Sequence, residues 1–531
     1  MTNAESPNPS PSDYNGAQAL ISTLVDSGVE VCFANPGTSE MHFVAALDSV
    51  PAMRGVLALF EGVVTGAADG YARMAGKPAA TLLHLGPGLG NGLANLHNAR
   101  RAHTPIVNVV GDHATYHKKY DAPLESDIDA VAGTVSGWLR RSESVAEVAT
   151  DAAEAVAAAA GPPGQIATLI LPADASWSPG GKPAAPVEPK PSELVADAVC
   201  ADLATLLGAG ESTVLLLGGT ATHEDGLRAA SRIAAATGAK VFAETFPARI
   251  QRGAGLPNVE RLGYLAEQVA YQLTDVKHII LAGARSPVSF FAYPGKASDL
   301  VPEGTQVHTL ANDTTEDAAE ALSRLAELVA EGTEPVLAPE HRPDLPAGPL
   351  TAQNWVEVIG ALLPERAIIA DEANTSGVLL PAATAGAPAH DVLTLTGGAI
   401  GYGLPVATGA AIACPDRPVI CLEADGSAMY TLSALWTHAR ENLDITTIVL
   451  ANSAYAILRM ELQRVGAQEA GPKAADLLDL SRPNLDFVSL ANGMGVPASR
   501  ATTAEELATL LTTALAEPGP HLIEAVVPSM M

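Results

Sequence analysis

The chain has 531 residues, of which 48% are hydrophobic, so it is long enough for two to four domains with large cores. Its formal net charge of −29 argues against nucleic acid and against anionic membrane surfaces as partners. Residues 1–13 are polar and lack a basic start and an apolar core, which indicates a short disordered leader rather than a secretory signal. No stretch reaches the roughly 18 uncharged apolar residues of a membrane span, so we expect a cytoplasmic protein.

Two segments dense in Pro and Gly, 176–192 and 332–349, show neither helix nor strand periodicity and are typical of linkers. They predict three domains, over 14–178, 192–332 and 350–531. Within each, short apolar runs alternate with longer Ala- and Leu-rich stretches, a pattern of parallel sheets covered by helices on both faces. The predicted fold class is α/β, with three doubly wound parallel-sheet domains. Ligands of such sheets bind in the loops that follow the strands.

The first candidate side chain in the chain is Glu61, which follows an apolar run and opens a helix rich in small residues. An acid in the first turn of a helix is stabilised by the helix dipole alone. A buried carboxyl group at a strand end can also hold or share a proton in catalysis. The residues by themselves leave both interpretations open.

The stretch 82–92, LLHLGPGLGNG, contains a G-x-G-x-G string that fails the spacing of the dinucleotide fingerprint. His84 stands at its head, either as a histidine bonded to backbone groups or as a group that moves protons. Further on, His113 and His117 are four residues apart, a spacing that suits zinc on a helix. No third ligand is evident. Two other interpretations remain open: His113 lies in a loop that contributes it to the active site, or the two histidines are solvated polar residues.

In the third part, the apolar run 418–422 leads to Asp425 and Gly426, and a stretch with helical spacing follows at once. The next apolar run ends at Asn452, 27 residues after Asp425. A turn and a helix cap explain these residues without function. Alternatively, the Asp and Asn oxygens hold Mg²⁺, which binds a diphosphate that the helix N-terminus also faces.

This unit resembles the thiamine diphosphate motif, GDG followed some 25–30 residues later by Asn, with Ala424 in place of the first Gly. The stretch that begins at Glu61 and contains ADGYA is similar to a second pattern of the same enzymes. The resemblance covers about residues 14–527 and is to the acetolactate synthase, benzoylformate decarboxylase and pyruvate decarboxylase superfamily. It implies pyrimidine-binding, central and diphosphate-binding domains, with active sites between two subunits of a homodimer or homotetramer.

The resemblance also implies roles for individual residues. Asp425, Asn452 and the Ala454 carbonyl would hold Mg²⁺, and Glu61 would bond the cofactor's pyrimidine N1′. The Gly398 carbonyl would accept from the 4′-amino group, and Ile400 would wedge the two rings apart. The other implied cofactor contacts are Asn91, Asn374, Thr375, Gly426, Ser427 and Tyr455. His84 and Thr38, the latter in the NPGTSE loop at 35–40, would act on the substrate.

The implied activity is decarboxylation of a 2-oxo acid, a small molecule, with the product released as an aldehyde or joined to a second carbonyl compound. The middle-domain stretch 283–295 lacks the Arg- and Asp-rich signature that helps acetolactate synthases hold a flavin, so FAD is not expected. A second histidine of benzoylformate decarboxylase is replaced there by Phe290, Phe291 and Tyr293. Two alternatives stay open: a 2-hydroxyacyl-CoA lyase and a non-catalytic cofactor-binding or regulatory subunit. A third hypothesis, that the chain is a nicotinamide dehydrogenase, is supported only by the α/β pattern.

Overall fold

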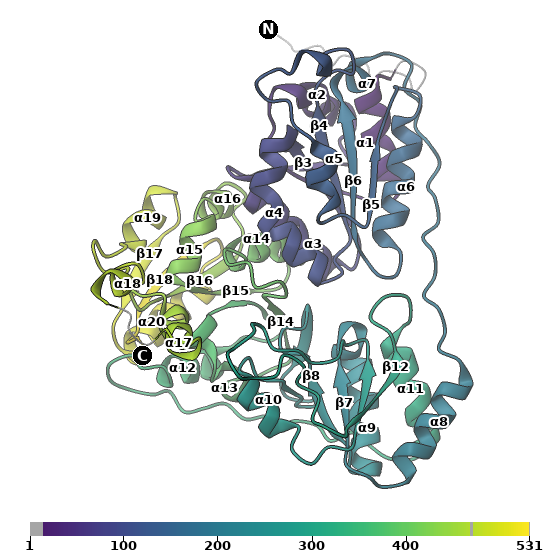
Figure 1. The fold of residues 1–531 in the computed structure, drawn as a ribbon. Helices are drawn as coiled ribbons and strands as arrows, with labels where there is room; N and C mark the ends of the chain where they lie inside the picture. The colour runs from purple at the N-terminus through teal and green to yellow at the C-terminus, as the bar shows by residue number, and fades with distance from the viewer. Residues whose placement is uncertain (1–13, 468–470, 530–531) are drawn as a thin grey trace. The chain divides into compact units, whose positions relative to one another are not determined.

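The computed structural model describes residues 14–467 and 471–529, so the predicted leader at 1–13 lies outside the described residues. Three β-sheets are each flanked by helices, which confirms the predicted α/β class (Figure 1). In the described part of the chain, no helix is both long enough and apolar enough to cross a membrane.

The first sheet has six strands in the order β2-β1-β3-β4-β6-β5, all parallel. Its helices α1 and α6 pack together on one face, and α3, α4 and α5 lie on the other (Figure 1). The strands are β1 (Val31–Ala34), β2 (Arg54–Leu57), β3 (Ala79–His84), β4 (Ile106–Asp112), β5 (Trp138–Arg141) and β6 (Ile166–Pro172). The helices are α1 (Gly16–Asp26), α2 (Met41–Ala46), α3 (Glu61–Ala75), α4 (Leu85–Arg101), α5 (Ile128–Gly133), α6 (Val148–Ala160) and α7 (Ala173–Trp177).

The second sheet has five parallel strands in the order β10-β8-β7-β11-β12. Its strands are β7 (Thr213–Leu217), β8 (Lys240–Ala243), β10 (Glu260–Arg261), β11 (His278–Ala282) and β12 (Gln306–Ala311). The helices of this part are α8 (Asp197–Gly208), α9 (Glu224–Thr237), α10 (Ala266–Gln272) and α11 (Ala318–Val329). The sequences of the short strand β10 and of strand β12 contain no continuous apolar run. Most of their side chains are exposed or half-buried, so these positions do not require apolar residues.

The third sheet has seven strands in the order β17-β18-β16-β15-β13-β14-β9. Its strands are β9 (Arg249–Arg252), β13 (Ile368–Glu372), β14 (His390–Thr394), β15 (Val419–Ala424), β16 (Ile445–Ala451), β17 (Ala498–Ala501) and β18 (His521–Val526). The helices in this part of the chain are α12 (Asn354–Leu362), α13 (Leu380–Ala383), α14 (Gly403–Ala413), α15 (Asp425–Thr431), α16 (Ala434–Arg440), α17 (Ala456–Arg464), α18 (Pro472–Asp476), α19 (Phe487–Gly493) and α20 (Ala504–Ala516), of which α14 and α16 belong to the same compact unit as the first sheet. Helix α15 begins at the residue after β15 ends, as the sequence predicts.

One strand departs from the expectation of purely parallel sheets. Strand β9 comes from the predicted central segment and pairs antiparallel with β14 of the third sheet. Arg249 of β9 lies 2.6 Å from Asp391 of β14, and Arg417 lies 2.6 Å from the same carboxylate. The added strand pairs the N–H and C=O groups that β14 would otherwise expose at the sheet edge.

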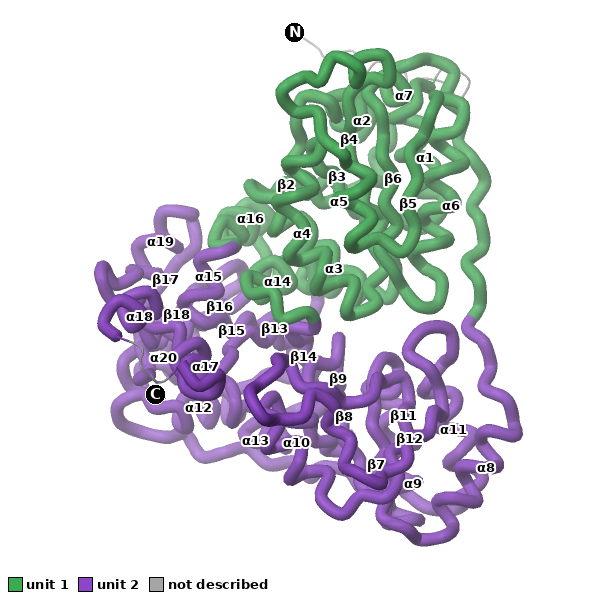
Figure 2. The backbone as a smooth tube through the Cα atoms, viewed as in Figure 1, with its two compact units in different colours: residues 1–191, 397–415, 431–443 green, residues 192–396, 416–430, 444–531 purple. Residues whose placement is uncertain are grey.

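The described residues pack as two compact units, drawn in green and purple in Figure 2. Unit 1 is made of the described residues within 1–191, 397–415 and 431–443, and unit 2 contains the rest. Helix α14 therefore belongs to unit 1, where it packs against α3 of the first sheet. Gly409 permits this close approach, because a Cβ there would lie 1.9 Å from the carbonyl oxygen of Ala67. The three domain boundaries predicted from the linkers stay a prediction.

Candidate functional site

Two of the sheets reverse their strand order at one point, and the predicted site residues follow the strands there. In the first sheet, β1 has β2 on one side and β3 on the other. In the third sheet, β13 has β14 on one side and β15 on the other. The loops diverge at such a switch point and leave a crevice in which α/β sheets bind ligands.

In unit 2, Asp425 lies at the switch point as the first residue after β15 and is only 3% exposed. Its Oδ2 accepts a hydrogen bond of 2.6 Å from the Ser453 N–H, and its Oδ1 accepts one of 2.8 Å from the Gly426 N–H. Burial raises the pKa of Asp425, although these backbone N–H groups act in the opposite direction. A bound cation would favour the ionised form of such a carboxyl group.

The loop after β16 places the other two predicted metal ligands beside this carboxylate. Asn452 follows β16 directly, and its Oδ1 accepts a hydrogen bond of 3.0 Å from the Ala454 N–H. Ser453, which bonds Asp425, has a φ of +55° and so turns the chain sharply between the two predicted ligands. The set of carboxylate, amide and carbonyl oxygens is the kind that Mg²⁺ prefers. In the described residues, no group of three or more His, Cys, Asp or Glu could hold a metal.

Across the switch point, the loop after β13 meets the loop after β15. Nδ2 of Asn374, which is exposed, donates a hydrogen bond of 3.1 Å to Oγ of Ser427. Asn374 and Thr375 lie in a short 3₁₀ helix, Asn374–Gly377, that follows β13. Four predicted cofactor contacts thus lie in unit 2: Asn374, Thr375, Gly426 and Ser427.

Gly426 is the second residue of α15 and has no room for a side chain. A Cβ there would lie 2.4 Å from Cε1 of Tyr455. The ring of Tyr455 therefore covers the start of α15, which brings a fifth predicted cofactor contact to the same place. A cavity of about 310 Å³ opens beside Asp425 and Ser453 and extends to Asn484, Arg500 and Glu524.

In unit 1, Glu61 opens α3 and is only 7% exposed. Its Oε2 accepts a hydrogen bond of 3.0 Å from Nδ2 of Asn91, which lies on α4 and is exposed. Asn91 thus holds one carboxylate oxygen of Glu61, which begins α3 shortly after the end of β2. This arrangement suits a carboxyl group that offers its other oxygen to a ligand.

His84, the last residue of β3, has a carboxylate partner that the sequence analysis did not single out. Its Nδ1 lies 2.9 Å from Oε2 of Glu40, whose side chain is fully buried. Glu40 Oε2 also accepts a hydrogen bond of 2.8 Å from the Gly37 N–H, and Ser39 Oγ lies 3.1 Å from His84 Nδ1. Because Glu40 binds Nδ1, the ring keeps its Nε2 for another partner.

Thr38, the predicted substrate contact of this loop, is exposed, and its role stays a prediction; the hydroxyl that lies beside His84 is that of Ser39. A sequence signal for Glu40 was present. Glu40 follows β1 and His84 ends β3, and these strands are neighbours at the switch point. The pairing of these two strands was needed to bring together side chains that are 44 positions apart in the chain.

The remaining histidine pair does not lie on a helix. His113 and His117 are in a turn after β4, with ring centroids 5.2 Å apart. This removes the helical geometry on which a zinc site was considered. Of the aromatic residues in the 283–295 stretch, Phe290 and Phe291 belong to a ring cluster in unit 2, in which the Phe290 ring centroid lies 5.4 Å from that of Phe246 and 5.1 Å from that of Tyr264.

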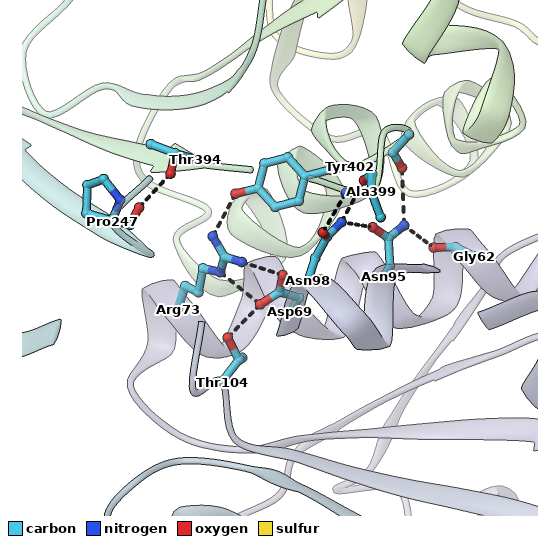
Figure 3. A network of polar contacts seen from close by, with 11 residues as sticks. Gly62, Asp69, Arg73, Asn95, Asn98, Thr104, Pro247, Thr394, Ala399 and Tyr402 are labelled. Carbon is cyan, nitrogen blue, oxygen red and sulfur yellow. Dashed lines mark hydrogen bonds and ion pairs between the residues drawn. The ribbon is translucent and has the colours of Figure 1, made fainter. Parts of the chain in front are cut away.

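The 397–402 segment, which carries Gly398 and Ile400, lies in unit 1 and is bonded to α4. Asn98 Nδ2 donates to the Ala399 carbonyl at 2.8 Å, and Asn95 Nδ2 donates to the Gly401 carbonyl at 3.1 Å (Figure 3). Gly398 itself is exposed. Within residues 14–467 and 471–529, no hydrogen bond reaches its carbonyl oxygen. The residues present therefore fit a cofactor group that donates a hydrogen bond there.

Comparison with known proteins points to one family. Residues 14–132 match the model of the N-terminal TPP binding domain of thiamine pyrophosphate enzymes, and residues 374–525 match the C-terminal TPP binding domain. The chain is 67% identical to a Mycobacterium tuberculosis protein named "Putative acetolactate synthase large subunit IlvX", over 97% of this chain and 100% of that protein. It is 31% identical to benzoylformate decarboxylase of Pseudomonas aeruginosa, over 94% and 96% of the two chains.

A solved structure gives the same result for the fold. The thiamine diphosphate-dependent 4-hydroxybenzoylformate decarboxylase of Rhodococcus jostii superposes with a TM-score of 0.85 at 25% identity. The alignment covers 97% of this chain and 99% of that one. The likeness thus extends over all three sheets.

Proposed function

The chain belongs to the thiamine pyrophosphate enzymes, and we propose that it uses thiamine diphosphate and Mg²⁺ to decarboxylate a 2-oxo acid. The product would be released as an aldehyde or joined to a second carbonyl compound, as the name of the relative from Mycobacterium tuberculosis suggests. When bound, the cofactor would supply a nucleophilic carbon for the 2-oxo group and a positively charged thiazolium ring as the electron sink for decarboxylation.

The observation that carries this proposal is the buried carboxylate of Glu61. A protein that only bound the cofactor would need no buried acid at this strand end. Glu61 instead keeps one oxygen on Asn91 and has the other for the pyrimidine N1′. With the cofactor bound, Glu61 would hold or share a proton at that nitrogen, a role that binding alone does not require. We therefore favour a catalytic role over a purely regulatory one.

We propose that Mg²⁺ is held by Asp425, Asn452 and the Ala454 carbonyl. Support comes from the backbone bonds that join the loops of these residues and from the oxygen-only donor set. The hydrogen bond between Asn374 and Ser427 joins two loops whose residues would hold the diphosphate.

His84 is the proposed group that moves protons near the substrate. Its Nδ1 faces the buried Glu40 carboxylate, so Nε2 is available on the side away from it. An imidazole held in this way takes or gives a proton without reorienting. Ser39 and Thr38 provide hydroxyl groups in the same loop.

The proposed enzyme uses no flavin, because the 283–295 stretch lacks the signature associated with flavin binding. It is proposed to be a cytoplasmic homodimer or homotetramer, in which Glu61 of one copy and the metal ligands of the other form each site. The 283–295 stretch has Phe290, Phe291 and Tyr293 and lacks the second histidine of benzoylformate decarboxylase, which argues against benzoylformate as the natural substrate.

The test is CO₂ release from stripped protein supplied with pyruvate, 2-oxobutyrate, branched-chain 2-oxo acids or benzoylformate. Thiamine diphosphate and Mg²⁺ are added separately and together, and no flavin is supplied. Turnover that requires both additions is the expected result, and the rates rank the substrates. Silence across the panel, with cofactor binding shown by calorimetry, would overturn the 2-oxo acid assignment and favour a thioester substrate or a non-catalytic subunit.

A further inference from the structure

Three polar residues of α4 face the elements that carry the proposed cofactor contacts of unit 1. Asn91, Asn95 and Asn98 recur at spacings of four and three residues, so they lie on one side of the helix. Asn91 bonds Glu61, and the other two bond the 397–402 segment. Neither Asn95 nor Asn98 is among the residues assigned to the cofactor, and nothing in the proposed chemistry uses them.

Asn95 joins two backbone segments through a single amide group. It is 2% exposed, and its Nδ2 donates to the Gly62 carbonyl at 2.8 Å and to the Gly401 carbonyl at 3.1 Å (Figure 3). Gly62 is the residue after Glu61, and Gly401 is the residue after Ile400. The Asn95 Oδ1 accepts a hydrogen bond of 3.0 Å from Nδ2 of Asn98. All the hydrogen-bonding atoms of the Asn95 side chain are thus in use.

Asn98 and His97 of α4 also bond the 397–402 segment, so that every second residue of the segment is hydrogen bonded to α4. Asn98 donates to the Ala399 carbonyl and accepts a bond of 3.2 Å from the Ala399 N–H. His97 Nε2 lies 3.2 Å from the Gly397 carbonyl oxygen. Residues 397, 399 and 401 are therefore anchored, while Gly398 between them is exposed.

The far end of the segment is fixed by a buried ion pair. Arg73 of α3 donates to the Tyr402 hydroxyl at 2.9 Å and pairs with Asp69 at 2.7 Å (Figure 3). Both side chains of this pair are at most 2% exposed. The segment is consequently held at one end by the half-buried His97 and in the middle and at the far end by buried side chains, more polar anchors than a short connection with an exposed glycine needs for folding alone.

We propose that Asn95 and Asn98 are positioning residues, which hold the 397–402 segment so that the Gly398 carbonyl meets the cofactor's amino group. Asn95 also fixes the backbone next to Glu61 through Gly62. The inference rests on the proposed function, since it assigns these residues to a bound aminopyrimidine.

The test compares Asn95→Leu with Asn108→Leu in the full-length protein. Leu keeps the branching of Asn but has no hydrogen-bonding atoms. Asn108 is a matched control, because it is fully buried in unit 1 and its side chain bonds Thr81 and Thr168 of neighbouring strands. Three quantities are measured: the Tm, amide hydrogen exchange of 397–402 without cofactor, and the Kd for thiamine diphosphate with Mg²⁺.

We expect both variants to lose Tm. Only Asn95→Leu should raise exchange of 397–402 and weaken cofactor binding, each by about tenfold, because two carbonyl bonds are lost. If Asn95→Leu binds and exchanges like wild type, or Asn108→Leu shows the same changes, the inference is wrong. If Asn95→Leu does not fold, Asn98→Leu, which frees Ala399, takes its place with the same criteria.

The failure of this inference can be told from failure of the proposed function. Proton exchange at the thiazolium carbon of the cofactor bound to the wild-type protein is followed by NMR. Exchange no faster than in free cofactor would refute the role proposed for Glu61. Fast exchange in the wild type, together with unchanged binding in Asn95→Leu, would refute the positioning role alone.

Discussion

Nδ1 of His84 lies 2.9 Å from Oε2 of Glu40, although the two residues are 44 positions apart in the chain. The carboxylate is fully buried and is itself held by the Gly37 N–H. A buried acid fixed in this way decides which ring nitrogen of the histidine carries the proton. His84 is therefore set up to use Nε2, and this relationship can be tested.

Glu40→Gln should lower kcat by about 10- to 100-fold, because the amide no longer holds the proton on Nδ1 of His84. Binding of thiamine diphosphate should stay within about twofold of wild type, since Glu40 is not among its proposed contacts. Ser39→Ala serves as the comparison and should have a smaller effect. An unchanged kcat in Glu40→Gln would show that His84 does not depend on this carboxylate.

Glu61→Gln should abolish turnover and leave Mg²⁺-dependent binding of the diphosphate largely intact. The amide cannot share a proton with the pyrimidine, whereas the metal ligands lie elsewhere in the chain. Steady-state kinetics and a calorimetric titration separate the two effects. Glu30→Gln, at a surface ion pair with Lys77, is the control and should behave like wild type. Wild-type turnover by Glu61→Gln would contradict the mechanism.

Gly426→Ala should raise the Kd for thiamine diphosphate by about tenfold, because its Cβ would force the Tyr455 ring to move. Gly493→Ala provides the control, since no atom lies within 4 Å of the added Cβ in that helix of unit 2. Titration of both variants with cofactor and Mg²⁺ checks the prediction. Equal affinities would mean that the ring does not take part in the cofactor site.

His438 should make the protein less stable in mild acid. Burial lowers its pKa to about 4, so the folded protein keeps the ring neutral while the unfolded chain binds a proton below about pH 6.5. Stability is therefore lost as pH falls from about 6.5 toward 4, by up to about 1.4 kcal/mol per pH unit for this residue.

The check is the fall in Tm between pH 7 and pH 5, which should be smaller in His438→Asn than in wild type. The variant also loses the 2.8 Å contact between Nε2 and Thr408, so its Tm at pH 7 is expected to be lower. His223 and His390, whose pKa values burial likewise lowers to about 4, remain in both proteins. An equal fall in Tm would rule out His438 as a source of acid sensitivity.

The sequence by itself determined the α/β class and the positions of the main strands. Continuous apolar runs between helical stretches are a local property, and they reappear as strands such as β4, β6 and β16. It also indicated which loops carry polar groups, because parallel strands bring their carboxyl ends to one edge. Asp425 and Asn452 were found in this way, and their loops are joined through Ser453.

Other features depended on contacts between segments far apart in the chain. Glu40 is an ordinary acid in a loop until β1 and β3 pair side by side and bring His84 against it. Asn95 is one polar residue among many on α4 until the 397–402 segment packs on it more than 300 positions later. Strand β9 was not predicted, because its short RIQR run has no apolar pattern and its pairing with β14 is decided by the sheet edge. Hydrophobic pattern is a property of neighbouring residues, whereas a buried polar group acquires its partner only when the chain has folded.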